Sequence, residues 1–390
     1  MSAVRTARRI AAARIGTAGA VAVLAAACGS TSASDGSHGT TAPAPSLPLA
    51  TAIAGPSQPG WAIVPMGGSS KDFENFWELF ARPAGSPTWK LATPPGVASN
   101  GGLVMAASGP GLVTGFRGSQ DLTFSPLAAI ASPAATWSQG SALVSPGLAS
   151  VPDALASGPH GAMIALTSTG QVQLAAPGTA TLTRLTTERE LARTAAGRAC
   201  GLTALTAVGF AAGGTPLLAG TCTRGGSAGL FAWEQGGAVA AGLPGQAGPT
   251  SVIGLETAGG RTTALLQSGS GKAATVLAAW SASGLADWTS SPAVSTGAGN
   301  LRSQEMWTNG GAALVLAGNK GEAISGPGGS WQSLPALPAH TVTLALGPAG
   351  QLQALAPAGA SLSVWQLAAG DGGWSRIQQI QVTVPYGSSS

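Results

Sequence analysis

The segment Gly225-Gly226-Ser227-Ala228-Gly229 matches the pattern G-x-S-x-G, in which a serine on a sharp turn acts as a nucleophile. Asp287 and His340 follow it in the chain order Ser, Asp, His that some serine hydrolases use. Such a turn needs a strand before the serine and a helix after it. The segment that follows, LFAWEQGG, has the composition of a strand. The pattern therefore predicts a glycine-rich turn and no catalytic triad.

Other residues with possible chemistry are equally isolated. Ser268-Gly-Ser-Gly271-Lys272 is similar to a phosphate-binding loop but lacks its first glycine and the hydroxyl residue after the lysine. His160, in Gly158-Pro-His-Gly161, and His340, after Pro338-Ala339, each lie at a predicted turn. The 12 acidic residues beyond Asp72 are scattered, so no carboxylate pair for glycoside hydrolysis stands out. We predict no catalytic, cofactor-binding or metal-binding residues.

The strongest chemical signal is Cys28. It follows a basic segment, residues 1–14, and an uncharged apolar stretch of 13 residues, Ile15 to Ala27. This stretch is too short to span a bilayer but suits the apolar core of a secretory signal peptide. Leu24-Ala-Ala-Ala27-Cys28 resembles a bacterial lipobox, in which the cysteine becomes lipidated and N-terminal after cleavage. Ordinary signal cleavage beside an incidental cysteine is the alternative. Lipidation of Cys28 would anchor the chain to the outer face of the cytoplasmic membrane.

The other two cysteines, Cys200 and Cys222, flank two apolar runs around a Gly-Gly turn, which indicates a β-hairpin. A loop of residues 211–214 leaves them three positions out of register. A turn nearer Ala211, or a bulge in the first strand, would bring them opposite each other. Export permits a disulfide between them. Two buried free thiols, or half of a metal site, are the alternatives.

Composition excludes several function classes. Only 8% of the 390 residues are charged, and the formal net charge is +4. Four arginines lie within residues 1–27, and without them 14 basic residues balance 14 acidic ones. A nucleic-acid partner is therefore not expected. Residues 28–58 carry the lipidated cysteine and then Ser, Thr, Gly, Ala and Pro, which predicts a flexible tether.

Residues 59–390 contain short apolar runs separated by glycine-rich turns, which is typical of all-β folds. A tryptophan followed by a short run and Pro or Gly recurs with spacings of 48, 151, 43 and 43, at Trp89, Trp137, Trp288, Trp331 and Trp374. The long gap holds weaker copies at Thr183 and near Val239. The repeat predicts a seven-bladed β-propeller of four-stranded antiparallel blades. The first unit lacks a strand, which either residues 46–54 or the tail IQVTVPY would supply. Most of the 11 tryptophans should pack in the core.

The spacing of Ser281, Ser283, Leu285 and Trp288 resembles the turn of BNR-type (Asp-box) propellers, Ser-x-Asp-x-Gly-x-x-Trp. Ala369-Gly-Asp371-Gly-Gly-Trp374 is a fragment of the same turn. The chain as a whole looks like an actinobacterial lipoprotein with a sortilin- or sialidase-like propeller. A sialidase would also need an arginine cluster and a tyrosine nucleophile. The only tyrosine is Tyr386, and the nearest arginine motif is Phe116-Arg117-Gly118-Ser119.

One helix is expected. Thr187-Glu188-Arg189-Glu190 has the spacing of a capping box, and Gly197 suits the end of the helix. With Arg184 and Arg198, this is the most charged stretch after the tether, and it is either a solvated surface or an interaction site. The segment Asp72 to Phe80 has aromatic residues at helical spacing, but FWELFA also suits a strand, which we predict.

These observations favour a membrane-anchored, monomeric propeller that recognises an envelope protein or polysaccharide without catalysis. The alternative is an extracytoplasmic glycoside hydrolase or lyase with its site in the propeller channel. Acidic, basic and histidine side chains that converge at the channel mouth would favour the enzyme. A mouth lined by Ala, Gly and Leu would favour binding.

Overall fold

In the computed structural model, residues 37–390 belong to one compact unit. The structure describes residues 51–53, 55, 57–66, 76–93, 103–108, 111–116, 128–130, 152–177, 179, 181–282, 284–297, 301–368 and 372–382, all in this unit. Cys28, Trp137, Asp371, Tyr386 and Arg117 lie outside these residues. Of the described helices, none has the length and apolarity needed to cross a membrane.

The first sheet settles which segment supplies the missing strand. Its four strands pair antiparallel in chain order: β1 (Thr51–Ile53), β2 (Gly60–Met66), β3 (Phe76–Arg82) and β4 (Lys90–Leu91). Residues 46–54 therefore contribute the strand, because Ala52 pairs with Ala62. The strand predicted for FWELFA is confirmed, since Phe76–Arg82 pairs with β2 along its whole length.

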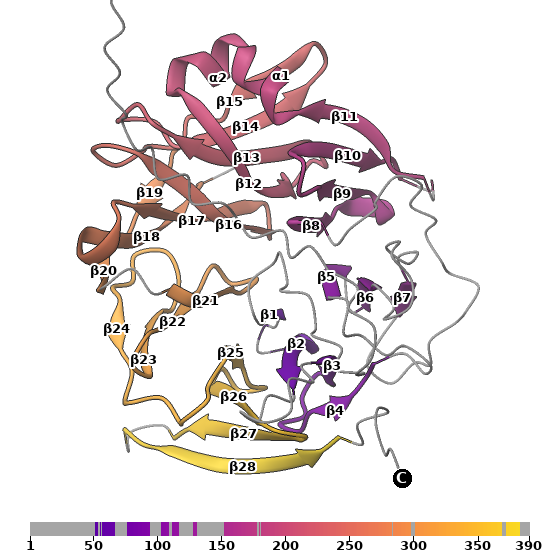
Figure 1. The fold of residues 1–390 in the computed structure, drawn as a ribbon, viewed down its shortest axis with the longest axis vertical. Coiled ribbons are helices and arrows are strands. Elements are labelled where there is room, and N and C mark those ends of the chain that lie inside the picture. Colours follow the sequence, from indigo (N-terminus) through magenta and orange to yellow (C-terminus); the bar gives the residue numbers. More distant parts are fainter. Residues whose placement is uncertain are drawn as a thin grey trace, which may run out of the picture. The chain divides into compact units, whose positions relative to one another are not determined.

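Two further sheets follow (Figure 1). The described part of the second has three strands: β5 (Leu103–Ser108), β6 (Gly111–Phe116) and β7 (Ala128–Ile130). The third has four: β8 (Ala154–Ser157), β9 (Met163–Leu166), β10 (Gln171–Ala175) and β11 (Thr183–Thr187). The weak repeat copy at Thr183 is therefore the fourth strand of its sheet, as the spacing predicts.

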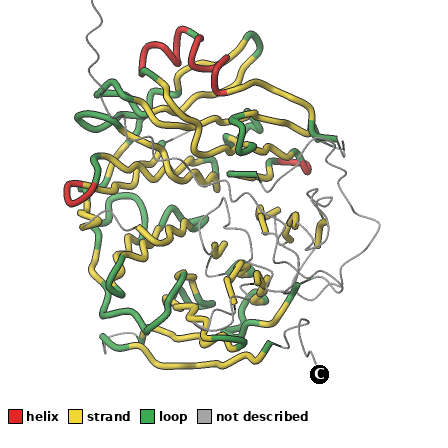
Figure 2. Tube along the Cα trace, in the orientation of Figure 1, coloured by secondary structure: helices red, strands yellow, loops and turns green. Residues whose placement is uncertain are grey.

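The expected helix is two short helices, α1 (Glu188–Arg193) and α2 (Ala195–Cys200), drawn in red in Figure 2. The capping box is confirmed: the Thr187 hydroxyl accepts from Glu190 N, and the Glu190 carboxylate accepts from Thr187 N. The predicted end at Gly197 is wrong. Gly197 lies inside α2, and Gly201 ends that helix with φ 69°, a conformation that glycine adopts at little cost.

The fourth and fifth predicted units form one nine-stranded sheet. Its strands are β12 (Leu202–Phe210), β13 (Pro216–Cys222), β14 (Gly229–Glu234), β15 (Gly237–Ala240), β16 (Thr250–Ala258), β17 (Arg261–Ser268), β18 (Ala274–Trp280), β19 (Thr289–Ser290) and β20 (Val294–Gly297). β14 pairs with β13 only up to Gly220, so the last two residues of β13, Thr221 and Cys222, pair with β16. Each of the two predicted units keeps its four strands in chain order, and this short pairing joins the two units.

The last two sheets keep the predicted four-strand pattern. One contains β21 (Leu301–Met306), β22 (Ala312–Leu316), β23 (Lys320–Ile324) and β24 (Gln332–Ser333). The other contains β25 (Thr343–Leu346), β26 (Leu352–Ala358), β27 (Ser361–Leu367) and β28 (Trp374–Gln381). Each sheet pairs in chain order. In Figure 1, β28 lies at the lower rim with β27, β26 and β25 successively inside it.

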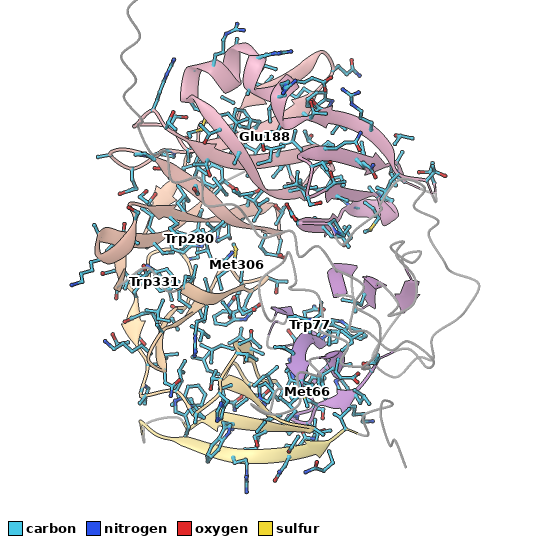
Figure 3. The ribbon with its side chains drawn as sticks, in the orientation of Figure 1. Met66, Trp77, Glu188, Trp280, Met306 and Trp331 are labelled. Carbon is cyan, nitrogen blue, oxygen red and sulfur yellow. A yellow bond between two sulfur atoms is a disulfide. The ribbon has the colours of Figure 1, made fainter. Side chains whose placement is uncertain are left out.

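Apolar side chains pack between successive sheets. One cluster joins β17 and β18 to β22, and includes Trp280 with Met306 and Trp331, which lie near one another in Figure 3. Another joins the first sheet to the last, through residues such as Phe80 and Leu355. The first strands of successive predicted units are also neighbours, as β12 is to β16 and β21 is to β25. Sheets of up-and-down strands that contact through their first strands make the fold propeller-like.

Candidate functional site

The structure does not assemble the serine motif into a catalytic site. Ser227 lies in a turn that forms an isolated bridge to Pro244, and its Oγ donates to the Ala228 carbonyl at 3.4 Å. Strand β14 follows it, as the sequence predicts. Asp287 and His340 both occupy turns with positive φ, 53° and 64°. Within the described ranges, no hydrogen bond joins any two of these three side chains.

The other isolated candidates are exposed turn residues. Lys272 lies on a single 3-10 turn, Gly271–Ala273, with its side chain exposed. His160 lies on a second such turn, Pro159–Gly161, with φ 56°. The prediction of turn histidines is confirmed for His160 and His340.

Polar side chains on the first strands link neighbouring predicted units. The Thr206 hydroxyl on β12 donates to the Val252 carbonyl on β16. The Gln304 amide on β21 donates to the Ile253 carbonyl. At the next junction, Thr343 Oγ1 on β25 donates to Glu305 Oε1 on β21 at 2.7 Å. Because these side chains bond to the first strands of neighbouring predicted units, they hold the scaffold together.

Glu256, near the end of β16, has chemistry of its own. It pairs in register with Thr263, which in turn pairs with Trp280, so the three side chains point to the same face of the sheet. Its side chain is half-buried. Burial raises the pKa of Glu256 to about 7. Such a carboxyl group exchanges its proton near neutral pH and donates a hydrogen bond in its protonated form.

A second group of buried polar residues joins the first sheet to the last. Arg82 is completely buried at the end of β3, and burial lowers the pKa of its guanidinium. Its Nη atoms donate to four backbone carbonyls, those of Gln58, Pro83, Ser86 and Leu346. The guanidinium carbon lies 5.9 Å from the centroid of the Trp89 ring. Sequence reasoning missed Arg82; its only signal is a cation at the end of an otherwise apolar strand.

Two glutamines complete this group, and we call Arg82, Trp89, Gln353 and Gln378 the first–last junction. Trp89 Nε1 donates to Gln353 Oε1 at 2.9 Å. Gln378, on β28, accepts from Trp89 N and donates to the Trp89 carbonyl, each at 2.8 Å. Trp89 is 289 residues away from Gln378 in the sequence, so the two ends of the described chain are joined by side-chain amides.

The ten described tryptophans are all buried or half-buried, which confirms the expectation that most pack in the core. Trp61, Trp89 and Trp280 are among the largest fully buried side chains. Binding through exposed tryptophan faces is therefore not a feature of these ten residues.

The helical pair α1–α2 carries most of the local charge. Arg184 forms an ion pair with Glu190, and this hydrogen bond lowers the pKa of the Glu190 carboxyl. Glu188 Oε2 accepts from Leu205 N on β12 at 3.0 Å. The Glu188 side chain, labelled in Figure 3, lies where α1 contacts the sheet. Arg198 donates to the Arg193 carbonyl. The predicted charged stretch therefore runs from β11 through the α1–α2 pair.

A disulfide joins this helical pair to the sheet. Cys200 and Cys222 are bonded, with their Cα atoms 5.2 Å apart. The expectation that both lie in strands is wrong for Cys200, which is the last residue of α2, because the chain turns at Gly201 before β12 begins. The hairpin itself has bulges between Leu202 and Ala204 and between Leu205 and Ala207. Sequence reasoning therefore missed that Arg224 lies beside α2.

Comparison with known proteins shows likeness in fold only. Neither a family model nor a curated protein matches the sequence. A solved protein from Lactobacillus plantarum is 12% identical with a TM-score of 0.51, covering 82% of this chain and 96% of its own. YCF48 from Cyanidioschyzon merolae is 14% identical with a TM-score of 0.45, over 85% and 98% of the two chains. The WD40 β-propeller domain of Doa1 is 10% identical with a TM-score of 0.43, over 77% and 87%.

Proposed function

We propose that this chain is a lipid-anchored, monomeric, seven-bladed β-propeller on the outer face of the cytoplasmic membrane. Residues 1–27 are its signal peptide, Cys28 its lipidated residue, residues 28–58 its tether and residues 59–390 the propeller, with β1 added from the tether. Its role is to recognise and hold an envelope protein, or a polysaccharide of the envelope, without catalysing a reaction.

The observation that supports this proposal is that polar side chains on the first strands form hydrogen bonds with neighbouring strands. Thr206, Gln304 and Thr343 bond to neighbouring strands, and so contribute to a rigid scaffold. Rigid scaffolds of this kind present loops and inserted elements to partners. The helical pair α1–α2, fixed by a disulfide, is such an element.

Cross-linking in cells tests the proposed recognition. We expect the wild-type protein to yield a reproducible cross-linked partner, identified by mass spectrometry, with cross-links concentrated on one set of loops. The same experiment reports the anchor, because Cys28→Ala should release the protein into the medium and remove the lipid mass from the N-terminal peptide. A protein that cross-links to no partner, or that stays on the membrane as Cys28→Ala, contradicts the proposal.

The alternative, a glycoside hydrolase or lyase, is favoured by one observation: burial raises the pKa of Glu256, as a general acid requires. Of two other buried carboxyl groups, Glu305 bonds to Thr343 and Glu78 bonds to Thr93. Envelope polysaccharides incubated with wild-type protein and with Glu256→Gln distinguish the two functions. Cleavage by the wild type alone would replace the recognition role with the enzyme.

A further inference from the structure

Four exposed arginines gather on the α1–α2 element and the turn bonded to it. Arg189 and Arg193 lie four residues apart on α1, and therefore on one helix face. Arg198 lies on α2, and its side chain reaches back to the Arg193 carbonyl. Arg224 follows β13 directly. We call these four residues the arginine surface.

The disulfide and two backbone hydrogen bonds fix Arg224 beside α2. Cys222 is bonded to Cys200, Thr223 N donates to the Gly201 carbonyl, and Arg224 N donates to the Cys200 carbonyl. The end of α2 and the end of β13 are therefore one rigid unit, although 22 residues separate the two cysteines. The disulfide and these hydrogen bonds therefore place Arg224 beside arginines that come from an earlier segment of the chain.

The acidic residues of α1 do not neutralise this surface. Glu190 is paired with Arg184, and Glu188 accepts a backbone hydrogen bond from β12. Glu234, exposed on β14, is the nearest remaining acid by topology, since β14 contacts α2. In the part of the chain that the structure describes, the side chains of Arg189, Arg193 and Arg224 make no hydrogen bond or ion pair.

Apolar side chains border the arginine surface. α2 packs against β15 and exposes Ala195 and Ala199 beside Arg198. Arginines next to exposed apolar residues are the combination that binds at a bilayer interface.

We propose that the arginine surface docks on the anionic phospholipid headgroups of the membrane that carries the protein. Three of its guanidinium groups have no acceptor among the described residues, so they suit many phosphates spread over a surface better than one anion in a fixed geometry. The inference rests on the proposed anchor: a flexible tether that ends before β1, over residues 29–50, has a mean reach of about 25 Å, which keeps the domain near the bilayer. Docking orients the domain, and leaves the loops away from α1–α2 to bind the envelope partner.

The test uses the protein as the cell makes it, with the mass of its Cys28 peptide measured first. It is mixed with vesicles of phosphatidylcholine alone or equimolar with phosphatidylglycerol. Hydrogen exchange of the α1–α2 amides then reports docking whether the chain is anchored or free. We expect slower exchange only on the anionic vesicles. Each arginine near such a surface contributes about a five-fold gain in binding, so changing all four to Gln should weaken docking on the order of several hundred-fold.

A matched variant controls for net charge. Arg261, Lys272, Lys320 and Arg376 are exposed cations on other elements, and changing these four to Gln should preserve docking. Changing the four arginines of the arginine surface to Lys should also preserve most of the docking, because Lys keeps the positive charge. This variant separates an effect of charge from an effect on folding. Equal exchange on both vesicle types, or equal loss in the control variant, overturns the proposal. Protection by inorganic phosphate or by an acidic peptide without vesicles would also overturn it. If Cys28 carries no lipid, only the proposed anchor is refuted, because hydrogen exchange still measures whether the free protein docks on the vesicles.

Discussion

Arg82 is the residue on which the first–last junction depends most. It is completely buried, and its guanidinium supplies the hydrogen bonds of four backbone carbonyls. In Arg82→Met the side chain keeps much of its length but leaves those carbonyls without donors. Because each hydrogen bond to a charged group contributes about 1.5–3 kcal/mol, we expect a loss of at least about 3 kcal/mol in the free energy of unfolding. Urea denaturation followed by tryptophan fluorescence measures it.

Arg261→Met is the matched control, because Arg261 is exposed at the start of β17. It should change the free energy of unfolding by less than about 0.5 kcal/mol. Equal effects of the two substitutions would mean that the buried guanidinium adds nothing beyond its volume.

Glu256 predicts a pH dependence with a definite sign. Burial raises its pKa in the folded protein to about 7, above the value near 4.5 of an exposed glutamate. The folded state then binds the proton more tightly, so this contribution to stability is fully present below pH 4.5. It is lost as the pH rises towards 7. Because the side chain is only half-buried, we expect a loss of about 2 kcal/mol.

Urea denaturation at pH 5 and pH 8 measures the effect of Glu256. Glu256→Gln should remove this part of the pH dependence, because its amide does not titrate. Glu234→Gln, at an exposed position, should leave the pH profile of the wild type unchanged. A Glu256→Gln protein with the full wild-type pH profile would assign the dependence to other groups.

The two residues show where prediction from sequence ends. Arg82 and Glu256 are ordinary charges at strand ends in the sequence, and only pairing with distant segments buries them. Leu346, an acceptor of Arg82, is 264 residues away. Ser227, Asp287 and His340 could be dismissed from sequence because local context, a strand after the serine, decides against the motif.

At the scale of the element, the disulfide should stabilise the α1–α2 pair against the sheet. Closing a loop of this length contributes about 3 kcal/mol in the chain-entropy model. The double variant Cys200→Ala, Cys222→Ala should lose that much and show faster hydrogen exchange in α2. Non-reducing peptide mapping should recover the Cys200–Cys222 cross-link from the wild type. Recovery of both as free thiols, or an unchanged unfolding midpoint, would contradict this role.

Elements were predictable wherever local chemistry specifies them. The hairpin predicted between the two cysteines is present as β12 and β13, and Thr187 specifies the start of α1 through its capping box. The helix end was wrong because Gly197 resembles a C-terminal glycine in sequence, whereas the turn at Gly201 depends on the bonds that its carbonyl accepts from Thr223, just after β13.

At the scale of the molecule, the repeat predicts propeller-like sheets but not which edges join. β16 reaches the last residues of β13 because β14 leaves that edge unpaired beyond Gly220. No composition or spacing in the sequence encodes such a junction, since edge pairing depends on where neighbouring strands end in space. The contribution of residues 46–54 to the first sheet likewise depends on contacts with β2.

Gln378 offers a test of how the first and last sheets act together. Its amide group replaces a strand partner for Trp89, accepting from the backbone N and donating to the carbonyl. Gln378→Leu removes both bonds, at about 1 kcal/mol each. We expect amide exchange to rise in β4 and in β28, while β12 to β18, which lie in a different sheet, keep their wild-type rates. Hydrogen exchange with mass spectrometry resolves these segments.

Gln379→Leu is the control on the same strand. The Gln379 amide bonds only to Ser361, in the adjacent strand of the same sheet, so this variant perturbs β28 without touching the first sheet. If both variants raise exchange in β4 equally, the effect comes from the strand and not from the link between sheets. If Gln378→Leu alone does so, a side chain near the end of the chain stabilises a strand near its beginning. Local opening of either sheet then raises the free energy of the other, and the first and last sheets open as one cooperative unit.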